Sequence, residues 1–166
     1  ISNGETFEYH FFWKGPLSQW VTSPFSEDGV RFKTAEHYMM YRKALLFGDK
    51  RFAAEILKAS HPREAKDLGR CVRNFNEDKW VGHREEIVYQ GSLLKFTQNP
   101  DKMEDLMATQ GKILVEASPE DQVWGIGFED NHPSTLQPEK WKGLNLLGFT
   151  LTRLREHFLR ESSLKV

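Results

Sequence analysis

A carboxylate and an amine in the segment TAEHYMMYRKALLF (34–47) are the residues whose types and spacing most readily suggest chemistry. Glu36 falls in the first turn of a helix that Thr34 could cap, where the helix dipole favours an ionised carboxylate. Lys43 follows seven residues later, on nearly the same face and about 10 Å further along the axis. With Met40 as an apolar spacer, this pair could flank a ligand. Spacing alone favours a plainer interpretation, a surface acid and a surface lysine on an amphipathic helix.

A second candidate is the acidic, glycine-containing segment EASPEDQVWGIG (116–127). Trp124 offers a ring face, and Gly125 and Gly127 let the backbone approach a ligand closely. Exposed amides in such a turn can hold an anion. A solvated loop with a core tryptophan is the plainer interpretation, and Gly-x-Gly without a strand and a helix around it is no dinucleotide fingerprint.

Cations recur in a third segment, Lys66–Arg73, and could bind phosphate near a helix end. A solvated helix face explains them somewhat better when the segment is judged by itself. The six histidines include no pair with metal-site spacing and further ligands, so we expect no metal and no cofactor.

The composition limits the class of protein. A net charge of −1 lacks the basic excess of a sequence-independent nucleic-acid binder, so a polynucleotide would be held locally or only a modified nucleotide gripped. Cys71 is the single cysteine, which excludes an internal disulfide; we expect it to be buried and structural. No run of about 18 apolar residues and no secretory signal is present, so we expect a cytoplasmic or nuclear protein with no membrane association.

The elements that must position these residues predict an α+β fold, mostly helical, with a short N-terminal β-hairpin or sheet packed on helices. The length suits one compact domain over residues 1–166. The loop 118–141 is long for a compact domain, and such loops are usually functional. We expect extended segments at 8–13, 19–22 and 113–115, a hairpin at 24–33, and helices at 34–47, 49–58, 62–70, 76–97, 99–111 and 144–159.

Taken together, the ordered segments resemble the NADAR family, named for an inferred link to NAD and ADP-ribose. Each motif is weak alone, but the set keeps its order and spacing over nearly the whole chain. The segments are FFWKGPLSQW (11–20), TAEHYMMYRKA (34–44), AKDLGR (65–70), RNF (73–75), Trp80, KFTQNP (95–100), LVEASPEDQVWGIG (114–127) and WKGLNLLGFTLTRLR (141–155).

The resemblance implies hydrolysis of an N-glycosidic bond between ribose C1′ and an exocyclic amine. Glu36 matches the family's catalytic glutamate, as acid/base, and Lys43 its motif lysine, either a nucleophile that forms a Schiff base or a phosphate and hydroxyl anchor. Asp121 completes the expected catalytic set. The residues expected at the substrate are Phe12, Trp13, Ser18, His37, Met40, Arg70, Trp80, Trp124, Gly125, Ile126, Gly127 and Asn145.

Trp124 and an aromatic residue of 11–13 would stack on a base. On chemical grounds, and not from the family match, we expect Arg70 and Arg73 with the amides of Gly125–Gly127 to hold a diphosphate. The leading expectation for the substrate is ADP-ribose attached to guanine in a nucleotide or nucleic acid. One alternative is the phosphoribosylamino-pyrimidine intermediates of riboflavin synthesis. Another, of a different class, is a module that binds ADP-ribose without turnover.

Overall fold

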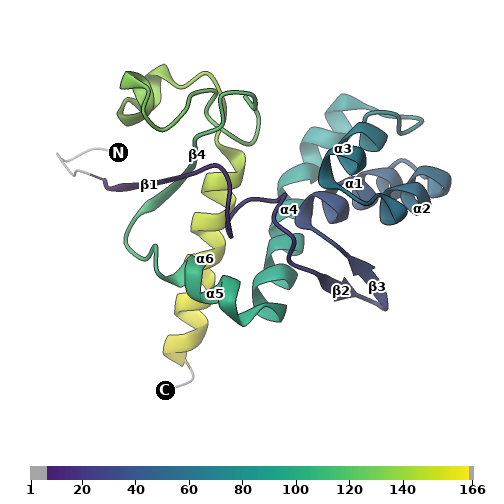
Figure 1. Cartoon of the computed structure of the whole chain (residues 1–166), viewed down its shortest axis with the longest axis horizontal. Coiled ribbons are helices and arrows are strands. Elements are labelled where there is room, and N and C mark those ends of the chain that lie inside the picture. The colour runs from purple at the N-terminus through teal and green to yellow at the C-terminus, as the bar shows by residue number, and fades with distance from the viewer. Residues whose placement is uncertain (1–6, 165–166) are drawn as a thin grey trace. The chain divides into compact units, whose positions relative to one another are not determined.

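The computed structural model describes residues 7–164, which are mostly helical with two small sheets, as expected (Figure 1). They fall into two compact units, each described here by itself. Unit 1 combines the N-terminal segment up to Ser18 with the chain from Glu104 onward, and unit 2 runs from Gln19 to Met103. The expectation of one domain over the whole chain stays a prediction.

Unit 2 begins with the predicted hairpin. Strands β2 (Phe25–Glu27) and β3 (Val30–Phe32) are antiparallel, and the turn between them has positive φ at Asp28 and Gly29. The paired rings of Phe25 and Phe32 both contact the fully buried Tyr38 ring. The hairpin thereby packs its apolar side on helix α1.

Four helices make up the rest of unit 2: α1 (Ala35–Leu46), α2 (Lys50–Lys58), α3 (Pro62–Gly69) and α4 (Glu77–Gln98). Three start at predicted caps, since side chains of Thr34, Asp49 and Asn76 accept backbone N–H bonds of the first turn. Close packing on α1 needs glycine at two points. A Cβ at Gly91 would clash with the Tyr38 ring and one at Gly69 with the Met40 side chain, so α4 and α3 approach α1 closely at these two glycines.

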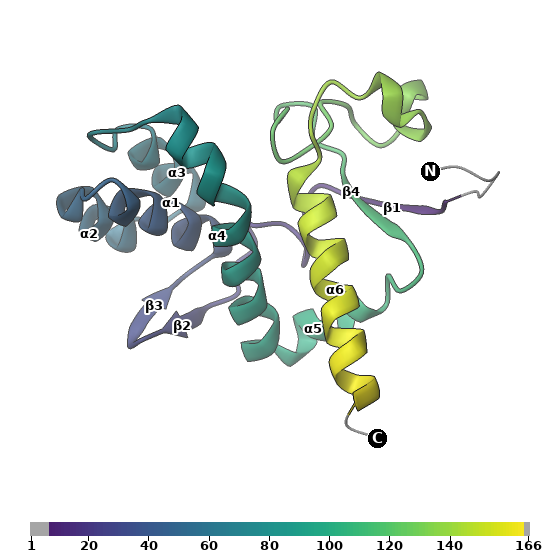
Figure 2. The same ribbon diagram turned by 180° about the vertical axis from the view of Figure 1, so that it is seen from behind.

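In unit 1, strand β1 (Tyr9–Phe12) pairs in parallel with β4 (Ile113–Glu116), and helix α6 (Leu146–Leu164) lies alongside β4 (Figure 2). Helix α5 (Pro100–Met107) spans the boundary between the units in sequence. The long loop between β4 and α6 contains two short 3-10 turns, η1 (Pro133–Leu136) and η2 (Pro138–Lys140).

Four local expectations were wrong. Residues 19–22 form turns because the Gln19 carbonyl accepts the Glu36 N–H at 3.0 Å, which folds this segment onto the start of α1. Helix α5 ends at Met107, before the positive φ of Gly111. Helix α6 starts at Leu146 because Asn145 has φ of 52°, and it continues past Leu159. Cys71 is exposed, since it lies in the turn after α3.

Candidate functional site

Glu36 is held in one orientation at the start of α1. Its side chain is only 5% exposed, and the Trp20 indole N–H donates to Oε1 at 3.1 Å. The bond from the Glu36 N–H to the Gln19 carbonyl places Trp20 beside it. A buried, oriented carboxylate is a group that can stabilise positive charge or move a proton at a substrate.

Lys43 lies two turns along α1 and is half-buried. Its Nζ is 4.7 Å from the centroid of the Phe75 ring and 5.5 Å from that of Trp80. Burial lowers the pKa of this amine; Glu77 and Glu36 oppose the shift, and Arg70 adds to it. The influence of Glu36 agrees with the predicted common face. Lys43 therefore releases its proton more readily than a solvated lysine, as a nucleophilic amine requires.

Two cations of α3 lie near the Trp20 ring. The Arg63 guanidinium is 5.3 Å and the Lys66 ammonium 6.0 Å from the centroid of its ring. The His61 ring meets the indole edge-on at 5.9 Å. Arg70 comes four residues after Lys66 and so lies on the same helical face. It is exposed, and its guanidinium is 4.0 Å from the Asp67 carboxylate. We call Arg63, Lys66 and Arg70 the α3 cation face; it suits phosphate.

Two other predicted substrate residues of α1 make structural contacts. The buried His37 ring lies 2.8 Å from Thr34 Oγ1 and 2.9 Å from the Ala59 carbonyl, so both ring nitrogens have partners. Burial lowers the pKa of His37, more than its bond to Ala59 raises it. Met40 is buried against Gly69. These contacts position α1 between its neighbours.

The expected loop site in unit 1 is built around Asp121. Its Oδ1 accepts the N–H groups of Val123 at 2.9 Å and Trp124 at 2.8 Å, which fixes the turn that carries the tryptophan. The amides of Ile126 and Gly127 donate to the carbonyls of Glu116 and Ser118, both at 3.0 Å. Two of the three amides expected to hold a diphosphate are thus used inside the loop.

Asn145 joins this loop to the sheet. Its side chain is 0% exposed; Oδ1 accepts the Glu116 N–H at 2.9 Å, and Nδ2 donates to the Leu114 carbonyl at 3.1 Å. Its own N–H donates to the Gly125 carbonyl at 3.1 Å. Asn145 therefore braces β4, the glycine turn and the start of α6 with one side chain and its backbone.

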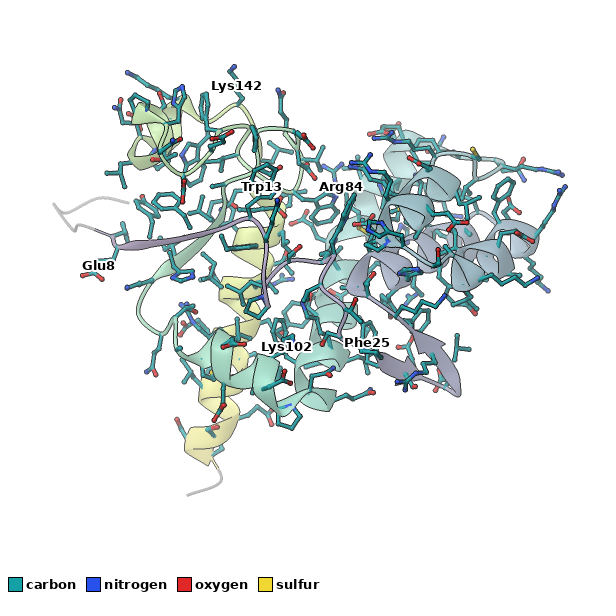
Figure 3. All side chains as sticks on the ribbon, viewed as in Figure 1. Glu8, Trp13, Phe25, Arg84, Lys102 and Lys142 are labelled. Atoms are coloured by element: carbon teal, nitrogen blue, oxygen red, sulfur yellow. The ribbon has the colours of Figure 1, made fainter. Side chains whose placement is uncertain are left out.

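A groove of about 600 Å³ lies along β1 within unit 1. Phe12 and Trp13 both line it; Phe12 is buried, whereas Trp13 is 37% exposed. Figure 3 shows Glu8 and Trp13 at opposite ends of β1. We call this cavity of about 600 Å³ the β1 groove.

Ser18, also expected at the substrate, is buried in the turn closed by its N–H bond to the Gly15 carbonyl.

The expected residues thus divide between the units. The structure brings Glu36 and Lys43 to one face with Trp80 and with Arg70 near enough to act on Lys43. Unit 2 holds Glu36, His37, Met40, Lys43, Arg70 and Trp80, and unit 1 holds Phe12, Trp13, Ser18, Asp121, Trp124, Gly125, Ile126, Gly127 and Asn145.

Sequence reasoning left Trp20, Phe75 and Arg63 without a role. The spacing of Arg63, Lys66 and Arg70 after the helix-starting Pro62 could have shown the cation face, because three- and four-residue steps share a helical face. The contact of Trp20 with Glu36 crosses sixteen positions, and no local pattern signals it.

Lys95 is a second buried amine that received no role. It is 1% exposed on α4, and burial, with a smaller effect of Lys102, lowers its pKa to about 7. Asn99 Nδ2 donates to its backbone carbonyl at 2.8 Å. With a pKa of about 7, the Lys95 amine changes between its charged and neutral forms near neutral pH.

In residues 7–164 we find no group of three histidine, cysteine, aspartate or glutamate side chains able to hold a metal ion. None of the helices in this range combines the length and apolar character that crossing a bilayer requires.

Comparison of the sequence with models of known protein families shows which family the chain belongs to. The NADAR domain model matches residues 10–159, so the chain belongs to the NADAR family.

Two relatives carry functional names. The chain is 44% identical over 145 residues to N-glycosidase R617 of Acanthamoeba polyphaga mimivirus, covering 84% of this chain and 85% of that protein. It is 30% identical over 147 residues to N-glycosidase YbiA of Escherichia coli strain K12, covering 89% and 83%. The NMR structure of E. coli YbiA superposes with a TM-score of 0.77 at 28% identity, covering 98% of this chain and 91% of that one. The fold is therefore the YbiA fold.

Proposed function

We propose that this protein is an N-glycosidase that hydrolyses the bond between ribose C1′ and an exocyclic amine. The observation that carries the proposal is the pair on α1: a buried Glu36 oriented by Trp20, and Lys43 with its pKa lowered by burial. The names of the relatives R617 and YbiA support the reaction class.

In this reaction the C1′–N bond breaks, the amine leaves with a proton, and water supplies a hydroxyl group to C1′. Glu36 is suited to stabilise the positive charge that develops on the ribosyl group and to pass the proton between water and the leaving amine.

Lys43 has two possible roles, which one experiment separates. As a nucleophile, its neutral amine attacks C1′, the leaving amine departs, and ring opening gives an imine that water hydrolyses to the free sugar and lysine. As an anchor, it stays charged over Phe75 and Trp80 and holds a phosphate or hydroxyl oxygen. Borohydride traps a sugar–protein adduct only in the first case, and Lys43→Ala must abolish that adduct.

We propose ADP-ribosylated guanine, in a nucleotide or nucleic acid, as the substrate. The α3 cation face supports a ligand with phosphates, since Trp20 contacts both Glu36 and two of those cations. The net charge of −1 favours a grip on one modified nucleotide over a long polynucleotide footprint. The phosphoribosylamino-pyrimidines share the scissile bond and carry one phosphate, which makes them the comparison substrates.

The test is a direct assay of purified protein on a guanine-ADP-ribosylated oligonucleotide and, separately, on a phosphoribosylamino-pyrimidine. We expect release of free ADP-ribose and unmodified guanine from the first, measured by chromatography with mass detection. Preferential hydrolysis of the pyrimidine substrate would reject the proposed substrate and keep the reaction class. Tight ADP-ribose binding without turnover of either compound would show a binding module instead.

A further inference from the structure

The two-stranded sheet of unit 1 has a closed edge on the outer side of β4. Leu114 donates its N–H to Thr152 Oγ1 at 2.9 Å, and its carbonyl accepts Asn145 Nδ2 at 3.1 Å. Glu116 donates its N–H to Asn145 Oδ1 at 2.9 Å, and its carbonyl accepts the Ile126 N–H at 3.0 Å. Both backbone groups of these two strand residues are thus used within the unit.

The outer edge of β1 is open. N–H groups of β4 and of the residue after it donate to the carbonyls of Glu8 and Phe12, at 2.9 and 2.7 Å. Because backbone groups alternate in direction along a strand, those of Tyr9 and Phe11 point away from β4. Among residues 7–164 this sheet has two strands, so no further strand covers that side. Proteins often protect such an edge with proline or charged residues, and the sequence YHFF of β1 contains no proline, lysine, arginine or acid.

The β1 groove follows this strand. Three successive strand residues, His10–Phe12, line it, whereas a cavity over one face of a sheet would be lined by alternate residues. Its other walls come from α5 with the residues after it and from the long loop. Its volume of about 600 Å³ lies within the range of roughly 300–1,000 Å³ usual for ligand sites. The cavity therefore offers room for an extended chain beside the backbone of β1.

The wall of the groove is acidic. Asp105, Glu129 and Asp130 line it, and no ion pair in the part of the chain that the structure describes neutralises any of them. Lys14 is the lysine of the wall. Burial, ahead of two neighbouring cations, lowers the pKa of His10, so that its ring is neutral at pH 7. The groove therefore favours a ligand with positive charges and disfavours one with phosphates.

A segment of a partner protein suits this groove better than a second copy of the chain does. Two copies joined through β1 would bring two sets of these carboxylates together, and like charges facing each other across an interface cost free energy. A single extended segment meets no such repulsion, and its lysine or arginine side chains can pair with the carboxylates. Main-chain hydrogen bonds to an open strand edge give affinity to peptides of many sequences, and the charge then provides the selection.

We propose that the β1 groove binds an extended, lysine- or arginine-rich segment of a partner protein, which adds as a strand to the open edge of β1. The backbone of the segment bonds to the edge at Tyr9 and Phe11, and its cations lie beside the three carboxylates of the wall. The interaction is independent of the proposed hydrolysis, because the groove belongs to unit 1 and the pair on α1 to unit 2.

The experiment titrates the full chain with the peptide acetyl-Lys-Val-Lys-Val-Lys-amide and with its acidic counterpart, acetyl-Glu-Val-Glu-Val-Glu-amide. Alternating valine favours an extended backbone in both peptides, which carry opposite charges. We expect the lysine peptide to shift the amide signals of Tyr9 and Phe11 in NMR spectra, and to bind about tenfold more tightly than the acidic peptide. Equal affinity for the two peptides, or no shift at millimolar lysine peptide, would overturn the proposal.

Methylation of the peptide separates strand addition from a general attraction of charges. A lysine peptide with every backbone nitrogen methylated keeps its side chains and charges but cannot donate hydrogen bonds to the edge. We expect it to bind about tenfold more weakly than the unmodified peptide, since the acceptors of β1 lose their partners. Unchanged affinity would reject strand addition.

Proline at position 9 tests the edge from the side of the protein. Tyr9→Pro removes an N–H that points away from β4, at the first residue of a strand, where proline is best tolerated. Tyr9→Ala removes the same ring and keeps the N–H, which makes it the matched control. We expect Tyr9→Pro to bind the lysine peptide about fivefold more weakly than Tyr9→Ala does. Equal binding by the two variants would contradict pairing at this edge.

Neutral variants test the acidic wall. Asp105→Asn with Glu129→Gln and Asp130→Asn should remove the preference for the lysine peptide, without loss of the folded spectrum, because all three residues are exposed. The matched control neutralises three exposed acids of unit 1 outside the groove, Glu104→Gln, Glu139→Gln and Glu161→Gln, and should keep the preference. An equal loss in both triple variants would show attraction to net charge alone and reject the site.

Sedimentation tests the choice of occupant. We expect the chain to be a monomer without peptide and to bind one lysine peptide per chain. A dimer without peptide that Tyr9→Pro dissociates and Tyr9→Ala keeps would place a second copy on the edge of β1 and overturn the proposal. Glu36→Gln should bind the lysine peptide like the wild type, so that loss of hydrolysis and loss of this interaction are scored separately.

Discussion

The α3 cation face and the β1 groove both place aromatic rings beside charges, but the charges are of opposite sign. Around Trp20 the neighbours are cations, with the carboxylate of Glu36 bonded to the indole N–H. Around Trp13 the groove has three carboxylates against one lysine. An aromatic surface alone can take any flat ligand, so the sign of the surrounding charge distinguishes the two places: cations favour a phosphate, and carboxylates disfavour one.

The two units also hold their residues by different means. In unit 2 the side chains project from helices whose starts are capped and whose contacts are made tight by Gly69 and Gly91. In unit 1 the long loop is held by hydrogen bonds to β4 and by Asn145. Substitution of Glu36 or Lys43, which project from a helix fixed by these contacts, should therefore act mainly on chemistry, whereas substitution of Asn145 in unit 1 should act mainly on stability.

The largest effect should come from Glu36→Gln, which keeps the size of the side chain and removes its charge. We expect kcat to fall about 10³-fold, within the usual range for a lost acid/base group, with little change in the affinity for ADP-ribose. Steady-state kinetics and a binding titration measure the two. Glu55→Gln, at an exposed position on α2, is the matched control. A Glu36→Gln enzyme with near-normal kcat would remove α1 from the chemistry.

Lys43→Ala should lower kcat about 100-fold, since it removes either the nucleophile or a charge at the substrate. The pH profile sharpens the assignment. A nucleophilic amine must be neutral, and burial lowers the pKa of Lys43, so activity should rise with pH through a midpoint below the free lysine value of about 10.4. Lys50→Ala, exposed on α2, should leave kcat unchanged. If Lys43 is instead a charged anchor, the pH profile should have the opposite slope, and activity should fall as the amine loses its proton.

Asn145→Ala should lower the free energy of unfolding by about 2–4 kcal/mol, because it leaves buried groups of Glu116 and Leu114 unpaired and places alanine at positive φ. Chemical denaturation measures this loss. Asn131→Ala, exposed in the same loop, should change stability by less than about 0.5 kcal/mol. Equal stability of the two variants would show that Asn145 does not brace unit 1.

The smallest effect should come from the paired substitution Arg63→Ala with Lys66→Ala. We expect KM for ADP-ribosylated guanine to rise about tenfold with kcat nearly unchanged, since partly exposed cations contribute to phosphate binding and not to bond breaking. The wild-type KM should also rise with salt more steeply than that of the variant. Arg51→Ala with Lys58→Ala, on the exposed side of α2, is the control. A KM that does not change would place the phosphates elsewhere.

Much of the local structure could be predicted because its causes are local. Thr34, Asp49 and Asn76 are caps that serve the N–H groups a few residues on, and all three were readable from the sequence. The hairpin followed from its turn residues in the same way. Errors arose where a distant partner decided the backbone, as for residues 19–22, which bond to α1, and for the start of α6, where the positive φ of Asn145 delays the helix.

The sequence by itself determined the family, the helical character, the caps and the common face of Glu36 and Lys43, because ordered motifs and helical periodicity are properties of the chain. Only the tertiary structure decided what surrounds that pair. The bond from Trp20 to Glu36, the rings of Phe75 and Trp80 over Lys43, and the burial that lowers its pKa all join separate segments. The charges and rings around Glu36 and Lys43 come from residues that are distant in the sequence, so spacing along the chain cannot predict them.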